Sequence, residues 1–147
     1  MQKLNLPDYK FRIKTEAKGN YIYDSVRRRF VSLTPEEWVR QNFIRYLAEE
    51  KKYPLSLMSV ERQMLINDKI FRFDLLIYNK QGDPLLMAEF KAPGVNISQT
   101  VFDQVVRYNM AFKVKRVLVS NGIQHYICHI DYETNSYSFL KEIPFYW

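Results

Sequence analysis

The stretch RFDLLIYNKQGDPLLMAEFKAP, residues 72–93, decides the fold of this protein. Two apolar runs flank a Gly-Asp-Pro turn, a pattern that predicts a β-hairpin. Each run carries an acid where a core residue is expected, Asp74 in the first and Glu89 in the second. The apolar residues LLIY follow Asp74 and LLMA precede Glu89, which is typical of strands buried on both faces.

The hairpin register predicts where these charges lie. A turn that pairs Tyr78 with Leu85 also places Asp74 directly opposite Glu89, with Cβ atoms roughly 4.5–5.5 Å apart. Like charges in this position destabilise a sheet, and when half-buried they raise a pKa or require a cation. Lys91 lies two residues beyond Glu89 and therefore points to the same face. We expect two carboxylates and an ammonium group to converge on one patch.

A bound hard cation would make such a patch favourable. Mg²⁺ takes oxygen ligands, usually one or two carboxylates with waters and a substrate phosphate, and Mn²⁺ is an alternative ion. Lys91 could then help to deprotonate a metal-bound water or neutralise charge on a phosphate. The alternative is structural, with Asp74 bonded to Lys91 on an exposed face. On these residues alone the two interpretations are equally supported.

The rest of the chain predicts a mixed sheet flanked by helices, an α+β arrangement in one domain over residues 1–147. Periodicity and turn signals indicate strands within residues 9–33, a helix over 35–51, a strand over 58–67, a helix over 98–114, a strand over 115–122 and a last hairpin over 124–140.

Composition limits the function classes. The 147 residues are 47% hydrophobic and carry a net charge of +6, which indicates a globular protein and favours a polyanionic partner. The only cysteine, Cys128, excludes an internal disulfide and indicates a reducing, cytoplasmic setting. No apolar run approaches the length of a membrane span, and residues 1–10 lack the apolar stretch of a signal peptide, so no membrane partner is expected.

Two glutamates at the start of the first helix compete for a role in the patch. Thr34 is a good N-cap, and Glu37 lies where a capping box places an acid, so Glu37 has a structural explanation. Glu36 has none, and it shares a helix face with Arg40 and Phe43 that could look toward the sheet. We therefore assign Glu36 to the site and Glu37 to structure.

The second helix offers two further candidates. Gln104 lies between Val101 and Tyr108 on the side that the pattern predicts to be apolar. A polar residue there is either satisfied in the core or reaches into a site. Tyr108, four residues further on, either packs against the sheet or takes part in the chemistry.

This ordered series resembles the PD-(D/E)XK nuclease superfamily. More closely, the segments TPEEWVRQ, FDLLIY, PLLMAEFKAPG, FDQVVRYN and VLVSNG, within residues 34–122, resemble the N-terminal nuclease domain of type I restriction enzyme R subunits. Phe73 stands where the superfamily name places proline, a proline that many members lack. The resembled domain is fused to a helicase-like motor, for which residues 1–147 leave no room.

The resemblance implies a restriction-endonuclease-like fold and Mg²⁺-dependent hydrolysis of DNA phosphodiesters. The implied partners are DNA and other restriction or defence subunits; the oligomeric state is left open. The alternative is a module of such a complex that binds DNA or a protein partner without cleavage. The implied roles are metal ligation by Asp74 and Glu89 with help from Glu36, water activation by Lys91, and support of the site or contact with the substrate backbone by Gln104 and Tyr108.

Overall fold

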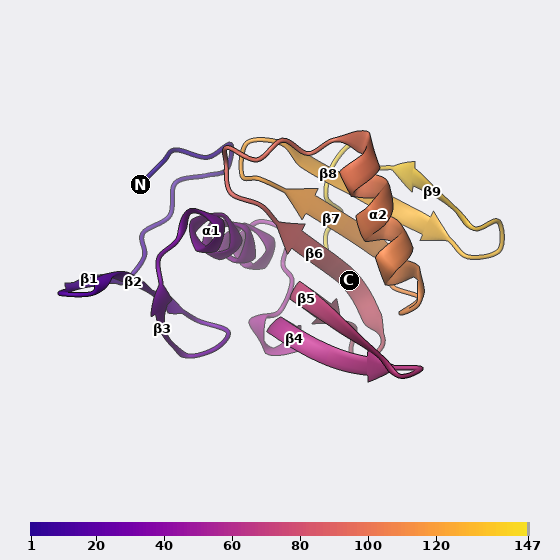
Figure 1. Cartoon of the computed structure of the whole chain (residues 1–147), viewed down its shortest axis with the longest axis horizontal. Helices are drawn as coiled ribbons and strands as arrows, with labels where there is room; N and C mark the ends of the chain where they lie inside the picture. Colours follow the sequence, from indigo (N-terminus) through magenta and orange to yellow (C-terminus); the bar gives the residue numbers. More distant parts are fainter. Residues whose placement is uncertain (147) are drawn as a thin grey trace.

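The computed structural model of the chain describes residues 1–146 and contains two β-sheets and two α-helices (Figure 1). Trp147, the last residue of the predicted domain, lies outside the described residues. The elements are β1 (Ile13–Glu16), β2 (Gly19–Asp24), β3 (Arg29–Ser32), α1 (Pro35–Glu49), a short 3₁₀ helix (Leu55–Leu57), β4 (Met58–Ile66), β5 (Lys69–Tyr78), β6 (Pro84–Phe90), α2 (Gln99–Met110), β7 (Arg116–Ser120), β8 (His125–Asp131) and β9 (Ser136–Phe139).

The larger sheet has six strands in the order β4-β5-β6-β7-β8-β9, and only its β6–β7 pair is parallel. The predicted mixed sheet flanked by helices is therefore confirmed. Strands β1, β2 and β3 form a separate antiparallel sheet, which lies beside α1 at the left of Figure 1. We call it the N-terminal sheet. No helix within the described residues is long and apolar enough to span a membrane.

The two helices cover opposite faces of the six-stranded sheet. From α1, Phe43 packs in one apolar cluster with Leu86 of β6, while from α2, Phe102 packs in a second cluster with Met87. Leu86 and Met87 are neighbours in sequence, and successive strand side chains point to opposite faces. Strand β6 is thus buried on both sides, which explains its continuous apolar sequence.

The start of α1 follows its sequence signals. Thr34 is the N-cap, and its hydroxyl accepts a hydrogen bond from the Glu37 backbone N–H at 3.0 Å. Pro35 occupies the first helical position, where its missing N–H costs nothing. The helix ends at Glu49, two residues earlier than predicted, and Lys52 then adopts a φ of +67°.

The central hairpin has the expected register along its length but not at its turn. Leu75 pairs with Ala88, and continuing this register places Asp74 beside Glu89. Tyr78 pairs with Pro84, however, so the predicted pairing of Tyr78 with Leu85 is wrong. The cause is a register shift after Ile77, which adds one residue to the β6 side of the turn.

Strand β5 changes faces at Asp74. Phe73 and Leu75 are two residues apart and would share a face in a regular strand, yet they belong to the two opposite apolar clusters. On the neighbouring strand β4, Glu61 has a φ of +51°, and the β4–β5 pairing skips from Val60 to Arg62. The register is the same on both sides of this break, so the ladder is interrupted at Glu61 and Asp74 without an extra residue in either strand. Asp74 therefore lies at this interruption, half-buried between the buried Phe73 and Leu75.

Candidate active site

The structure brings the three predicted hairpin residues together at the end of β6. The Lys91 Nζ lies 3.1 Å from Oε1 of Glu89, and the Phe90 backbone N–H donates a 2.8 Å hydrogen bond to Oδ2 of Asp74. Glu89 lies close enough to Asp74 for its charge to raise the Asp74 pKa. Two carboxylates and one ammonium group thus share one patch. Their chemical roles stay predictions.

Asp74 holds an electrostatically unusual position. Burial raises the pKa of its carboxyl group from 3.8 to about 6; the Phe90 N–H and the Arg40 charge oppose this rise, and the charges of Glu89 and Glu36 add to it. Only 25% of the side chain is exposed. Keeping this carboxylate ionised at neutral pH therefore costs free energy that a cation would recover.

The first helix contributes Glu37 rather than Glu36 to the buried charge. The Glu37 carboxylate accepts hydrogen bonds from Arg40 at 2.7 and 3.0 Å, from Arg27 at 2.8 Å and from Gln41 at 2.9 Å. These donors hold the Glu37 pKa at about 2 despite burial, which acts in the opposite direction. The capping-box prediction for the Glu37 side chain is therefore wrong.

The prediction failed because the Glu37 carboxylate accepts hydrogen bonds from arginines and not from the Thr34 backbone N–H. A capping box has the acid accept from the N-cap N–H, but the Thr34 N–H donates to the Ser32 carbonyl oxygen at 3.2 Å. Charge-assisted bonds to arginine are stronger than a bond to a backbone amide. Arg40, three residues after Glu37, was the signal available in the sequence, because side chains at this spacing are neighbours on a helix.

Two arginines that the sequence analysis did not assign to the site, Arg27 and Arg40, bind the Glu37 carboxylate, and Arg40 connects it to the patch. Arg40 is 4% exposed and lies 3.8 Å from Oδ1 of Asp74, and it also donates to Glu61 at 2.9 Å. Arg27, from the β2–β3 turn, pairs with Asp24 and donates to Glu61 at 3.1 Å. We call this set of charged residues the arginine network: Asp24, Arg27, Glu37, Arg40 and Glu61. It runs from the N-terminal sheet through α1 to the edge of the predicted site.

Glu36 has a less defined place. Its side chain is exposed, and its charge contributes to raising the Asp74 pKa, so it lies near the patch without being packed against it. Its predicted role as an assisting metal ligand stays a prediction.

The two candidate residues on α2, Gln104 and Tyr108, are both exposed. The face that packs on the sheet contains Phe102, Val105, Val106 and Asn109, so placing Gln104 on the apolar side is wrong and its side chain is exposed. The Tyr108 hydroxyl accepts a 2.8 Å hydrogen bond from the Arg72 backbone N–H, two residues before Asp74. Its ring lies 4.8 Å from that of Phe71. Tyr108 thus supports β5 from the side.

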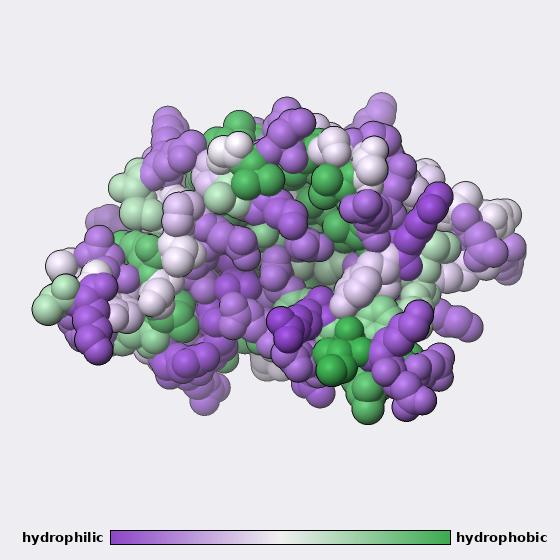
Figure 2. All heavy atoms as spheres, viewed as in Figure 1, coloured by the Kyte–Doolittle hydropathy of each residue, from purple (hydrophilic) through white to green (hydrophobic). Residues whose placement is uncertain are grey.

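An open groove of about 720 Å³ lies next to the patch. Figure 2 shows hydrophilic side chains gathered over the middle of this face, between the N-terminal sheet and the six-stranded sheet. The groove is lined by parts of the N-terminal sheet, the start of α1, β4 and the residue after Lys91: Tyr21, Arg27, Arg29, Phe30, Val31, Ser32, Thr34, Pro35, Glu36, Glu37, Arg40, Glu61 and Ala92.

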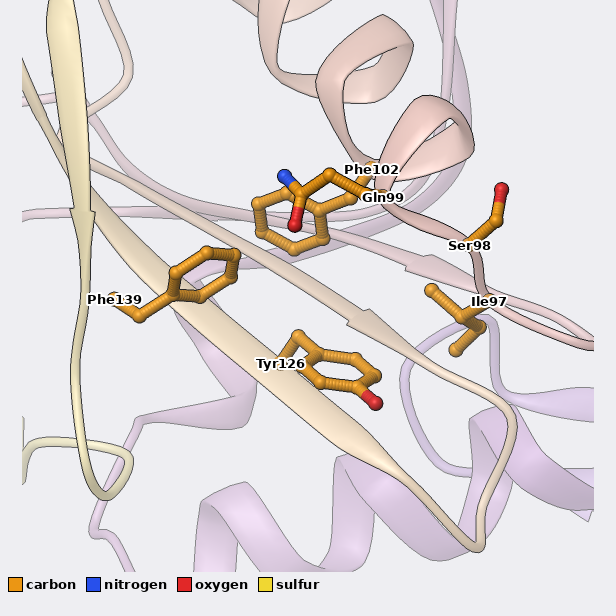
Figure 3. Close-up of a pocket in the computed structure, with 6 residues that line it drawn as sticks. All are labelled: Ile97, Ser98, Gln99, Phe102, Tyr126 and Phe139. Carbon is orange, nitrogen blue, oxygen red and sulfur yellow. The ribbon is translucent and has the colours of Figure 1, made fainter.

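A second, smaller pocket has a different character. It measures about 120 Å³ and lies between the start of α2 and strands β8 and β9 (Figure 3). The rings of Phe102 and Phe139, with centroids 4.9 Å apart, form part of its wall with Tyr126. None of the predicted site residues lines it, whereas Glu36 lines the groove.

The donor set of the patch suits one class of metal ion. Among residues 1–146, no three His, Cys, Asp or Glu side chains are grouped closely enough to hold a metal ion by themselves. Mg²⁺ is usually bound through one or two carboxylates, with waters and substrate phosphates completing its shell. The neighbouring carboxylates of Asp74 and Glu89 fit this pattern. Burial and then the charge of Glu89 raise the Asp74 pKa, an effect that a bound cation would oppose.

A mixed sheet with a helix on each face and a charged patch on its central hairpin defines a restriction-endonuclease-like domain. The sequence of residues 35–144 matches the family described as Type I restriction enzyme R protein N terminus. The chain belongs to this family.

A solved structure supports the fold. It is a fragment assigned to an HsdR subunit of a type I restriction enzyme from Vibrio vulnificus YJ016, with a TM-score of 0.51 and 20% sequence identity over 77% of this chain. The alignment covers 24% of that structure, so this chain spans about a quarter of its length. No curated protein sequence matches the chain.

Proposed function

We propose that this chain is a Mg²⁺-dependent DNA endonuclease domain of the PD-(D/E)XK type that works within a type I restriction system. One observation carries the proposal: Asp74, Glu89 and Lys91 meet at the end of β6, beside an open groove, in a chain of the R-subunit family. Buried or half-buried charges without a role are costly, so such a patch points to a function.

Asp74 and Glu89 would hold the metal ion, Mg²⁺ or Mn²⁺, with Glu36 assisting from the start of α1. When bound, the ion polarises a phosphate oxygen and lowers the pKa of a coordinated water. Phe90 and Arg40 fix the Asp74 carboxylate from two sides, through a backbone N–H and a guanidinium. This prior orientation reduces the reorganisation needed during the reaction.

Lys91 is the group placed to act on the reacting phosphate. Its Nζ lies 3.1 Å from the Glu89 carboxylate, and its side chain is 31% exposed, so the ammonium is accessible to a ligand. An ammonium there can donate to a developing negative charge on the phosphate, or take part in proton transfer from the attacking water. In this proposal Gln104 contacts the substrate backbone, and Tyr108 supports β5 beside the metal ligands.

Asp74→Asn is expected to stabilise the metal-free protein at pH 7.5 by on the order of 2–3 kcal/mol, at about 1.4 kcal/mol per pKa unit. A raised carboxyl pKa means that Asp74 stabilises the fold fully below pH 3.8, and that this contribution is lost as the pH rises through about 6. Asparagine resembles the protonated acid and keeps this contribution. Denaturant unfolding in EDTA at pH 7.5 and pH 4 measures the effect, which should shrink at the lower pH.

The same variant should lose Mg²⁺ binding in a calorimetric titration, because one of two carboxylate ligands is gone. Higher apo stability with lost metal affinity is the combination expected of a functional site. Lower stability in EDTA at pH 7.5 would show that Asp74 is a structural partner of Arg40 instead.

DNA binding should be electrostatic and without sequence preference, because the chain carries a net charge of +6, which attracts a polyanion without reading its sequence. The logarithm of the affinity for duplex DNA should fall linearly with the logarithm of salt concentration, at about −0.9 per neutralised phosphate. Fluorescence anisotropy with labelled duplexes of unrelated sequence checks this. Salt-independent binding, or strong preference for one short sequence, contradicts it.

A second candidate function is a module that binds DNA without cutting it. The chain carries a net charge of +6 and the exposed Arg29 lines the groove, which would favour a polyanion with or without chemistry. The other two arginines of the groove, Arg27 and Arg40, are paired with Glu37. A plasmid nicking assay with Mg²⁺ and Mn²⁺ separates the two. Metal-dependent nicking supports the endonuclease, whereas tight DNA binding without nicking under either ion favours the binding module.

A further inference from the structure

The positive charge of this protein is concentrated before the family match begins. Residues 1–33 contain eight Lys or Arg and three Asp or Glu, a net charge of +5 out of the +6 of the whole chain. The remaining residues are close to neutral. The family match covers residues 35–144, so the N-terminal sheet lies outside the matched region, and the predicted catalytic residues do not account for it.

One face of the N-terminal sheet alternates cations with aromatic rings. Register places Lys14 opposite Tyr21, and Tyr23 opposite Phe30. The Lys14 Nζ lies 4.6 Å from the centre of the Phe30 ring, and the Arg12 guanidinium lies 4.5 Å from that of Tyr23. The Lys14 side chain is 46% exposed and forms a surface ion pair with Glu16 at 2.9 Å, and Arg12 is exposed, so both cations lie at the surface. Cations beside aromatic rings are typical of surfaces that follow a nucleic-acid strand.

This sheet forms a wall of the groove at the candidate active site. Tyr21, Arg29 and Phe30 line the groove from the N-terminal sheet, and Ala92, which follows Lys91, lines it at the site. A polymer that lies in the groove therefore touches both. Arg29 is exposed, so its guanidinium is available to a ligand.

The arginine network holds the wall in a fixed position. Arg27 is 12% exposed and joins the β2–β3 turn to Glu37 of α1 at 2.8 Å and to Glu61 of β4 at 3.1 Å. Arg40 continues the network to within 3.8 Å of Asp74. Because these pairs are largely buried, the wall is positioned before any ligand arrives, which lowers the entropic cost of binding.

We propose that the N-terminal sheet binds the phosphate backbone of the DNA segment that leads into the active site, with Lys14 and Arg29 as the phosphate-contacting residues. This inference rests on the proposed function, because it takes DNA as the ligand of the groove. The charges explain the arrangement: a polyanion approaching the carboxylates of Asp74 and Glu89 meets repulsion, and the cations of the wall offset it.

The test compares two variants that each lose two positive charges. Lys14→Gln/Arg29→Gln removes cations from the wall, and Lys113→Gln/Lys115→Gln removes exposed cations from the loop before β7, whose parallel partner β6 carries the site at its opposite end. Binding of a labelled DNA duplex is measured by anisotropy in EDTA at several salt concentrations, so that cleavage plays no part. Melting temperatures confirm that both variants are folded.

Loss of two phosphate contacts should reduce the slope of log affinity against log salt concentration by about 1.8 and weaken binding on the order of 50-fold at 0.1 M salt. The control variant should change affinity by less than about threefold. Equal effects in both variants, or an unchanged slope in the wall variant, overturn the inference and leave the proposed endonuclease untouched. Absence of DNA binding by the wild type also overturns it. If the wild type binds DNA but never cuts it, and the affinity of the wall variant depends less on salt, the inference stands and the proposed endonuclease fails.

Discussion

Lys91→Ala is expected to lower Mg²⁺-dependent nicking of plasmid DNA by about 10²–10³-fold while leaving metal affinity nearly unchanged. The ammonium is not a metal ligand, and it is placed 3.1 Å from one of the two proposed ligands. Its removal therefore takes away charge stabilisation or proton transfer in the transition state without removing a donor to the ion. Single-turnover nicking rates and a calorimetric Mg²⁺ titration measure the two effects separately.

Lys113→Ala is the matched control, since it is an exposed lysine in the loop before β7. It should nick at the wild-type rate and shows whether losing one positive charge matters by itself. Lys91→Arg keeps the charge but not the geometry of a compact ammonium, and should recover little activity. An unchanged rate in Lys91→Ala would remove Lys91 from the chemistry.

Glu37→Ala is expected to destabilise the protein by about 3–5 kcal/mol, the usual cost of removing one member of a buried ion pair. The carboxylate accepts four hydrogen bonds, and its loss leaves Arg40, which is 4% exposed, and Arg27 without the more buried of the two carboxylates that they share. Urea unfolding at pH 7 measures the loss. Glu36→Ala, next to it but exposed, should change stability by less than about 0.5 kcal/mol in metal-free buffer.

The stability difference between wild type and Glu37→Gln should depend on pH. The Glu37 pKa is lowered from 4.5 to about 2, so its contribution is fully present above pH 4.5 and is lost as the pH falls through about 2. The difference should therefore be constant from pH 7 to about 5 and decrease steadily below. A difference that stays constant down to pH 2.5 would mean that shape, and not charge, explains the cost.

Local sequence signals determined the elements and much of the hairpin. Thr34 and Pro35 start α1 as expected, because caps depend on residues within one turn. The turn between the two apolar runs predicted that β5 and β6 pair with Asp74 next to Glu89, and the observed pairing of Leu75 with Ala88 continues to that position, although the pairing at the turn itself differs. The mixed sheet between two helices followed from the order of these elements.

Only the tertiary structure decided which helix faces are buried and which partners the charges find. Gln104 was placed on the wrong side of α2 because residues 102, 105, 106 and 109 form the packed face, and this depends on where the sheet lies. Glu37 was assigned to a local cap although Arg40 lies within one helical turn of it, and its more distant partner Arg27 is ten residues away in sequence. Glu61, which pairs with both arginines, is further still. Hydrogen-bond partners outside one helical turn are selected by packing, because a charge buried by the fold takes whichever counter-ion the fold brings within reach.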